Sequence, residues 1–213
     1  MANGIRHVML GVQEQRQGAQ IPARFVPRRI NARDIKKASK NEVRKAFIDR
    51  LTLSKSRLDD ICETLNTIAK QKPAVDQVIE ELNPESGLRI KKVTTPIGVI
   101  GIIFESRPNV FCDAAALCLR SRNASILRPG TESLGTVKEL HRLMSIAIKE
   151  LDLPKNCVQL IQDSDREQVK QLIKMTKYVD VIVPRGGKSL VELVETEARV
   201  PVFAHLEGIV HIY

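Results

Sequence analysis

From residue 97 onward, segments that are apolar along their whole length alternate with longer amphipathic segments. A strand that is apolar on both faces must be covered on both, and parallel pairing with helices on either side achieves this. The pattern therefore predicts a doubly wound α/β fold with a mainly parallel, Rossmann-like sheet. The expected strands are residues 97–104, 124–128, 158–161, 180–184, 201–205 and 209–213.

The segments between these strands have a helical period. Residues 112–121 and 132–150 are expected to be helices, Ser164 and Glu167 form a capping-box pattern that opens a third, and Gly186-Gly187 leads into a fourth. An earlier helix is expected at 54–72, where apolar residues recur at steps of three and four before Pro73. A loop around 83–87 separates this helix from the sheet.

The sequence predicts three parts and no catalytic domain. Residues 1–30 are rich in Arg and Gln, contain Pro22 and Pro27 and show no sustained period, which is typical of a poorly ordered basic arm. Their Arg-rich start also resembles a transit peptide, but no Ser occurs before position 39, so a disordered extension is favoured. Residues 31–96 are expected to be a helical segment with a connecting strand, and 97–213 a dinucleotide-binding domain, with no catalytic domain after it.

Charge and cysteine usage exclude several functional classes. The net charge is +9, but residues 1–40 hold nine Lys/Arg against two Asp/Glu, so only +2 remains for the rest of the chain. Nucleic-acid binding by the domain is therefore disfavoured. Cys62, Cys112, Cys118 and Cys157 lack the spacing of a metal site. No apolar run approaches the roughly 18 residues of a membrane span, so we expect a cytoplasmic protein with free thiols, no metal and no membrane partner.

Ligands of doubly wound sheets bind at the carboxyl ends of the strands. Three polar segments follow the predicted strands: Glu-Ser-Arg-Pro-Asn (105–109), Arg-Pro-Gly-Thr-Glu-Ser (128–133) and Pro-Arg-Gly-Gly (184–187). Glycines at a helix start can present backbone N–H groups to an anion, and Arg185 can add a charge. A tight strand-to-helix turn would explain the glycines but not the arginine.

The segments P-x-G-V-I-G-I-I-x-E-S-R-P-N-V and I-x-P-R-G-G carry a specific family resemblance. From about Asn31 to Tyr213 the chain resembles glutamate-5-semialdehyde dehydrogenase (γ-glutamyl phosphate reductase), a branch of the aldehyde dehydrogenase superfamily. The resemblance implies an oxidoreductase of proline biosynthesis that reduces L-glutamyl 5-phosphate with NADPH through a cysteine thioester. The resemblance is also compatible with a homo-oligomer or with a partner that supplies the catalytic half.

The resemblance assigns cofactor contacts to the three polar segments. Arg107 would serve anionic groups, Arg128 would pair with a ribose phosphate, and Gly130 would let the backbone approach the cofactor. For Glu105-Ser106-Arg107, the alternative is a polar strand end that caps a helix. The full predicted set is Glu105, Ser106, Arg107, Pro108, Asn109, Arg128, Gly130, Glu132, Arg185, Gly186 and Gly187.

The chain departs from the family at two turns. Pro129-Gly130 stands where the family usually has two glycines, which stiffens the loop and affects the choice of cofactor. Arg122 stands where the family commonly has Gly, so the turn is expected to be strained if φ is positive there.

No cysteine of this chain matches the family's catalytic cysteine, which lies in a second domain after the last predicted strand. Cys112 is near a helix start, but no base is indicated beside it, and the other three cysteines are expected in the core. No catalytic residue is therefore assigned, and the chain alone is expected to be inactive. The alternative is a non-catalytic dinucleotide-binding or interaction protein derived from that enzyme.

Overall fold

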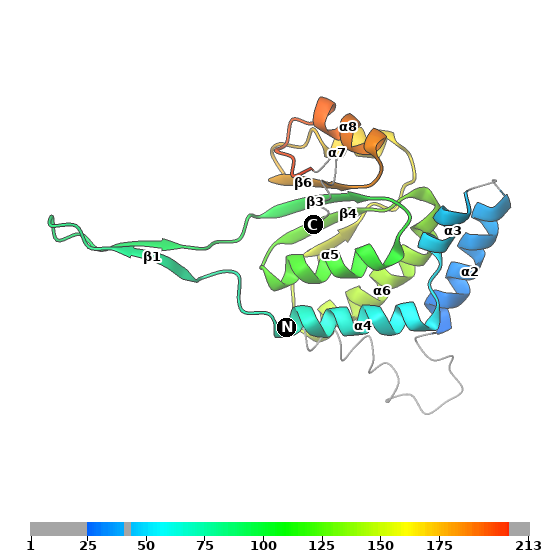
Figure 1. The fold of residues 1–213 in the computed structure, drawn as a ribbon, viewed down its shortest axis with the longest axis horizontal. Helices are drawn as coiled ribbons and strands as arrows, with labels where there is room; N and C mark the ends of the chain where they lie inside the picture. Colours follow the sequence, from blue (N-terminus) through cyan, green and yellow to red (C-terminus); the bar gives the residue numbers. More distant parts are fainter. Residues whose placement is uncertain (1–24, 41–43, 205–213) are drawn as a thin grey trace, which may run out of the picture.

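The fold is built on four parallel strands, in a computed structural model that describes residues 25–40 and 44–204 (Figure 1). The order across the sheet is β5-β4-β3-β6, and every neighbouring pair is parallel. This confirms the predicted fold class. The strands are β3 (Val99–Phe104), β4 (Ala124–Arg128), β5 (Val158–Leu160) and β6 (Val181–Arg185).

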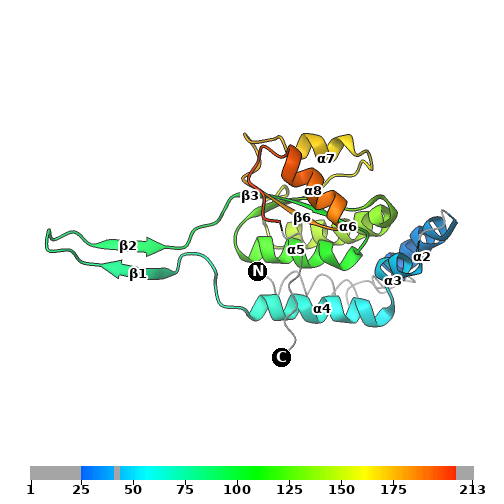
Figure 2. The same cartoon turned by 45° about the horizontal axis from the view of Figure 1, so that its top comes forward.

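Helices cover both faces of the sheet (Figure 2). Ile102 and Phe104 of β3 pack into the larger core with α5 (Pro108–Arg120) and α6 (Leu134–Glu150), whereas Ile103 enters a second core with α7 (Glu167–Leu172) and α8 (Lys188–Glu197). Successive side chains of a strand point to opposite faces, so a fully apolar strand contributes to both cores. The helix α4 (Lys55–Lys70) forms an outer layer against α5, and Ser54 caps its first turn by accepting from the N–H of Arg57.

The helices α2 (Phe25–Lys40) and α3 (Lys45–Leu51) precede α4. Residues 25–30, which the sequence analysis places in the arm, thus belong to α2, and residues 1–24 lie outside the described residues. Pro27 is compatible with this helix because it lies in the first turn, where an N–H has no partner within the helix. The Asp34 carboxylate accepts from both the N–H and the hydroxyl of Thr136 at 2.7 Å, which docks α2 on the start of α6.

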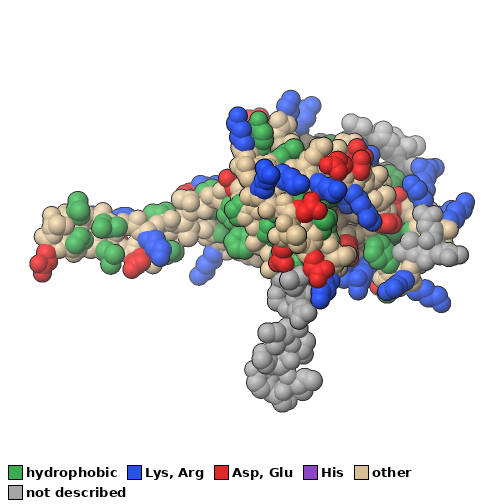
Figure 3. All heavy atoms as spheres, turned by 90° about the horizontal axis from the view of Figure 1, so that it is seen from above, with side chains coloured by type: hydrophobic (Ala, Val, Ile, Leu, Met, Phe, Trp, Pro, Cys, Tyr) green, Lys and Arg blue, Asp and Glu red, His purple; other side chains and the backbone are tan. Residues whose placement is uncertain are grey.

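An antiparallel hairpin of β1 (Val78–Leu82) and β2 (Ile90–Val93) extends away from the domain (Figure 3). The sequence predicts only a connecting strand and a loop here. Charged residues interrupt the apolar ones, and within the described part of the chain the hairpin packs on no core that would impose a clear pattern. Its exposed large apolar side chains are Val78, Ile79, Leu82, Leu88, Ile90 and Val93.

Two local predictions are wrong. Ser164 does not cap α7, because Arg166 is the N-cap residue and the side chain of Asp165 accepts from the N–H of Glu167. The predicted strand at 201–205 is reduced within the described residues to one parallel bridge between Val202 and Ile182. The last predicted strand, 209–213, lies outside the described residues.

Arg122 has a φ of 56°, the left-handed conformation that the sequence analysis flags at this turn. A residue with a side chain is strained there, and the exposed Arg122–Asp76 ion pair offsets little of the strain. We expect Arg122→Gly to raise the free energy of unfolding by about 0.5–1 kcal/mol in urea denaturation. Arg122→Ala is the matched control, because it removes the ion pair but keeps the strain. Equal stability of the two variants would contradict this explanation.

Candidate functional site

The three polar segments that follow β3, β4 and β6 meet at one edge of the sheet. Because these strands are parallel neighbours, their carboxyl ends lie side by side. The N–H of Glu105 donates to the carbonyl of Arg185 at 3.1 Å, which joins the first segment to the third. The structure therefore brings the predicted residues of all three segments to one edge.

The carboxylate of Glu105 lies at the start of α8. Its Oε1 accepts from the N–H of Gly187 at 2.6 Å, and a Cβ on Gly186 would lie 2.8 Å from its Cγ. From the sequence, the amides of Gly186 and Gly187 are expected to bind an external anion. In the structure, an internal carboxylate already binds the Gly187 amide, so an external anion reaches that amide only if Glu105 moves.

A second internal contact joins the turns after β3 and β4. Ser106 is buried, and its hydroxyl donates to Glu132 Oε2 at 2.7 Å. A Cβ on Gly130 would lie 2.7 Å from the hydroxyl oxygen and 3.1 Å from the backbone nitrogen of Ser106. Gly130 therefore allows the two turns to touch, whatever its relation to a ligand.

Arg128 lies at the end of β4 and points toward the loop after β5. Its side chain is buried, and Nη2 donates to the carbonyl of Ser164 at 3.0 Å. Burial lowers the pKa of Arg128, and the nearby carboxylates of Glu132 and Asp163 act in the opposite direction. Its Nε is buried without a hydrogen-bond partner among the described residues. This leaves one donor at the edge that no other described residue satisfies.

Three more predicted residues lie around the start of α5. Arg107 is the exposed N-cap residue of α5, Pro108 is its buried first residue, and Asn109 is exposed and donates to Asp113 at 3.3 Å. Proline suits this position because its missing N–H has no partner in the first turn. Arg185 is exposed at the end of β6. Of the predicted arginines, Arg107 and Arg185 are thus the exposed ones.

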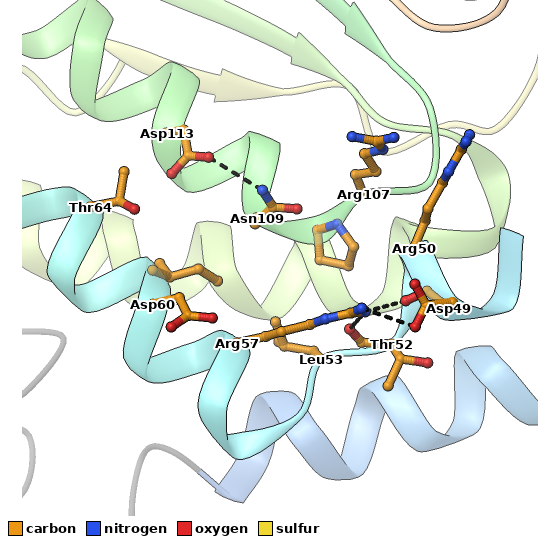
Figure 4. A pocket seen from close by; sticks show the side chains of 12 residues that line it. Asp49, Arg50, Thr52, Leu53, Arg57, Asp60, Thr64, Arg107, Asn109 and Asp113 are labelled. Atoms are coloured by element: carbon orange, nitrogen blue, oxygen red, sulfur yellow. Dashed lines mark hydrogen bonds and ion pairs between the residues drawn. The ribbon is translucent and has the colours of Figure 1, made fainter. Parts of the chain in front are cut away.

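A cavity of about 440 Å³ lies beside the Arg107–Asn109 turn (Figure 4). Its walls come from the end of α3, the start of α4 and the first turns of α5, so it is next to the edge described above. Apart from Arg107, its charged residues were not predicted from the sequence, although Asp113 follows Asn109 by one helical turn and was therefore detectable. The missed residues are Asp49, Arg50, Arg57, Asp60 and Asp113.

Asp113 is a partly buried carboxyl group of this cavity. Burial raises its pKa, and the hydrogen bond from Asn109 opposes that shift. Its Oδ1 is buried without a hydrogen-bond partner among the described residues. Among the described residues, the carboxylate therefore has Asn109 as its one hydrogen-bond donor.

Three of the four cysteines are poor candidates for a reactive thiolate. Cys112 is completely buried, and burial followed by the charge of Asp113 raises the pKa of its thiol far above the ordinary value. Burial also raises the pKa of Cys118 to about 11 and that of Cys157 above its ordinary value. Within residues 25–40 and 44–204, no His/Cys/Asp/Glu group could hold a metal, and no helix is long and apolar enough to cross a membrane.

Comparison with solved structures identifies the class of fold. At 16% identity, the propionaldehyde dehydrogenase of Rhodopseudomonas palustris matches 94% of this chain with a TM-score of 0.64, and 40% of its own chain is covered. An engineered glycolyl-CoA reductase with bound NADP⁺ matches 95% of this chain at 16% identity and a TM-score of 0.65, with 40% of its chain covered. The domain thus has the α/β fold found in these aldehyde dehydrogenase-fold proteins.

Relatives of higher identity are γ-glutamyl phosphate reductases. The chain is 47% identical over 184 residues to the γ-glutamyl phosphate reductase of Brucella suis, covering 86% of this chain and 44% of the relative. The γ-glutamyl phosphate reductase of Thermotoga maritima has a TM-score of 0.86 at 34% identity, with 94% of this chain and 47% of that chain covered. No family model matches the sequence. The chain is homologous to γ-glutamyl phosphate reductase and spans a little under half the length of these relatives.

The contact between the two turns predicts a specific coupling. Gly130→Ala forces a Cβ against the Ser106 hydroxyl, and we expect a loss of about 1–3 kcal/mol in the free energy of unfolding. Ser106→Ala removes that oxygen, so the double variant should lose less than the sum of the single variants. Urea denaturation of the four proteins measures the coupling. Strictly additive losses would contradict a direct contact between these positions.

Proposed function

We propose that this chain binds NADP(H) at the carboxyl edge of its sheet and forms the cofactor-binding part of a γ-glutamyl phosphate reductase. The reaction is the NADPH-dependent reduction of L-glutamyl 5-phosphate to L-glutamate 5-semialdehyde, a step of proline biosynthesis in the cytoplasm. The observation that carries the proposal is the 47% identity to a γ-glutamyl phosphate reductase, found in a chain whose β3 and β6 turns lie side by side.

The sheet topology supports a nucleotide at this place. From β3 the chain proceeds to β4 and β5 on one side, then crosses to β6 on the other side of β3. The crevice outside such a switch point is where doubly wound sheets bind their ligands. The turns at this switch point are 105–109 and 184–187, the two segments with the strongest family resemblance.

The residues at this edge fit an anionic dinucleotide. Arg107 and Arg185 are exposed and can contact phosphate oxygens, while the buried Nε of Arg128 still lacks a partner among the described residues. Arg128 supports the loop after β5 through Ser164, so Arg107 and Arg185 are the principal charged contacts in this proposal.

The chain's own residues would bind and position the reactants. The cofactor, when bound, supplies the hydride. Bonds from Glu105 to Gly187 and from Ser106 to Glu132 hold the turns in place, so the edge needs little rearrangement to present its arginines. Asn109 places an amide donor at the start of α5, next to the cavity.

Titration of NADPH fluorescence with the purified chain tests this function. We expect saturable binding, and we expect Arg185→Ala to weaken it about tenfold, which corresponds to the loss of roughly 1.4 kcal/mol of phosphate contact. Arg199→Ala is the matched control, because this exposed arginine follows α8 and lies toward the opposite edge of the sheet. Absence of saturable binding up to millimolar NADPH would contradict the proposal.

A further inference from the structure

We propose that the cavity beside the Arg107–Asn109 turn is an amino-acid subsite, in which Asp113 and Asp60 bind the ammonium group of a zwitterionic ligand and Arg50 binds its carboxylate. The inference rests on the proposed function, because it assigns the amino-acid end of the substrate to a place next to the cofactor edge. The family resemblance assigns cofactor contacts but no residues to the amino-acid end of the substrate.

The cavity carries both signs of charge at different places. Figure 4 shows Asp60 and Asp113 toward one side and Arg50 and Arg107 toward the other. Arg57 is already engaged, because its guanidinium donates to Asp49 and to the carbonyl of Thr52. Arg50 and Arg107 form no ion pair with another described residue, and the same is true of Asp60 and Asp113.

This charge arrangement selects the ligand. A dinucleotide or free phosphate would meet the carboxylates of Asp60 and Asp113, and a polyamine would meet the arginines. A ligand with an ammonium and a carboxylate satisfies both sides. The volume of about 440 Å³ suits a small ligand of this kind.

Asp113 is the residue that most needs a partner. Its Oδ1 is buried without a donor, and its Oδ2 receives one long bond of 3.3 Å from Asn109. A ligand ammonium in the cavity can donate to the remaining lone pair of Oδ2 while Asn109 keeps its own bond.

The cavity lies next to the edge at which we propose that the cofactor binds. Arg107 is the N-cap residue of α5 and belongs both to the cavity wall and to the turn at the cofactor edge. Asn109 and Asp113 then follow along the same helix, one turn apart. An amino acid held at Asp113 would extend its side chain toward Asn109 and the edge, where a nicotinamide has to reach the acyl carbon.

Saturation-transfer NMR with the full 213-residue chain tests this subsite, using L-glutamine as the probe and 4-carbamoylbutanoate as the analogue without the ammonium. We expect L-glutamine to bind at millimolar concentration and the analogue at least tenfold more weakly. Asp113→Asn should remove this preference. Asp152→Asn is the matched control, because Asp152 is exposed after α6 and its positive φ of 52° suits asparagine.

The same samples separate this inference from the proposed function. Retained NADPH binding without saturable L-glutamine binding, or equal binding of both probes, would overturn the subsite alone. Absence of NADPH binding in the unaltered chain would contradict the proposed function.

Thermal unfolding of the Asp113→Asn variant gives a further readout. Since burial raises the pKa of Asp113, Asp113→Asn should raise Tm at neutral pH, with the gain vanishing as acid protonates the native side chain. A lowered Tm at neutral pH would indicate a structural role instead.

Discussion

The burial of β3 on both faces is the constraint on which the rest of the structure depends. This strand supplies Ile102 and Phe104 to one core and Ile103 to the other, and it pairs in parallel with β4 and with β6. Because β3 is buried on both faces, its polar residues lie beyond the end of the strand. The turn after β3 therefore lies between the turns that follow β4 and β6. The hydrophobic effect thereby positions the charged residues of the site.

The turn after β3 divides the site into two regions with different chemistry. Glu105 and Ser106 face neighbouring turns and bind Gly187 and Glu132, so their polar groups are used to hold the edge together. Arg107 and Asn109 face outward, toward the proposed cofactor contacts and the mixed-charge cavity. One continuous segment can therefore fix the geometry of the edge and also present the groups that meet ligands.

The sequence predicted the four strands of the sheet because they are mostly apolar; 124–128 matches β4 residue for residue, and the helix predicted at 54–72 is α4 at Lys55–Lys70. The hairpin of β1 and β2 was missed because no core gives it a period. The boundary of α2 was missed because Pro27 suggested a break but is tolerated in a first turn. At the site, the three segments and the strain at Arg122 were predictable from local patterns. The partners of Glu105, Ser106 and Arg128 were not, since each is distant along the chain.

The central claim is that the carboxyl ends of β3, β4 and β6 form one nucleotide-binding edge, and amide chemical-shift mapping tests it most directly. A ¹⁵N-labelled chain titrated with NADPH should show its largest, saturable shifts at residues 105–109, 128–133 and 185–187. Exposed amides of the β1–β2 hairpin serve as an internal reference and should remain unchanged. Saturable shifts confined to the hairpin or to the opposite edge of the sheet, with these three segments unaffected, would contradict the account.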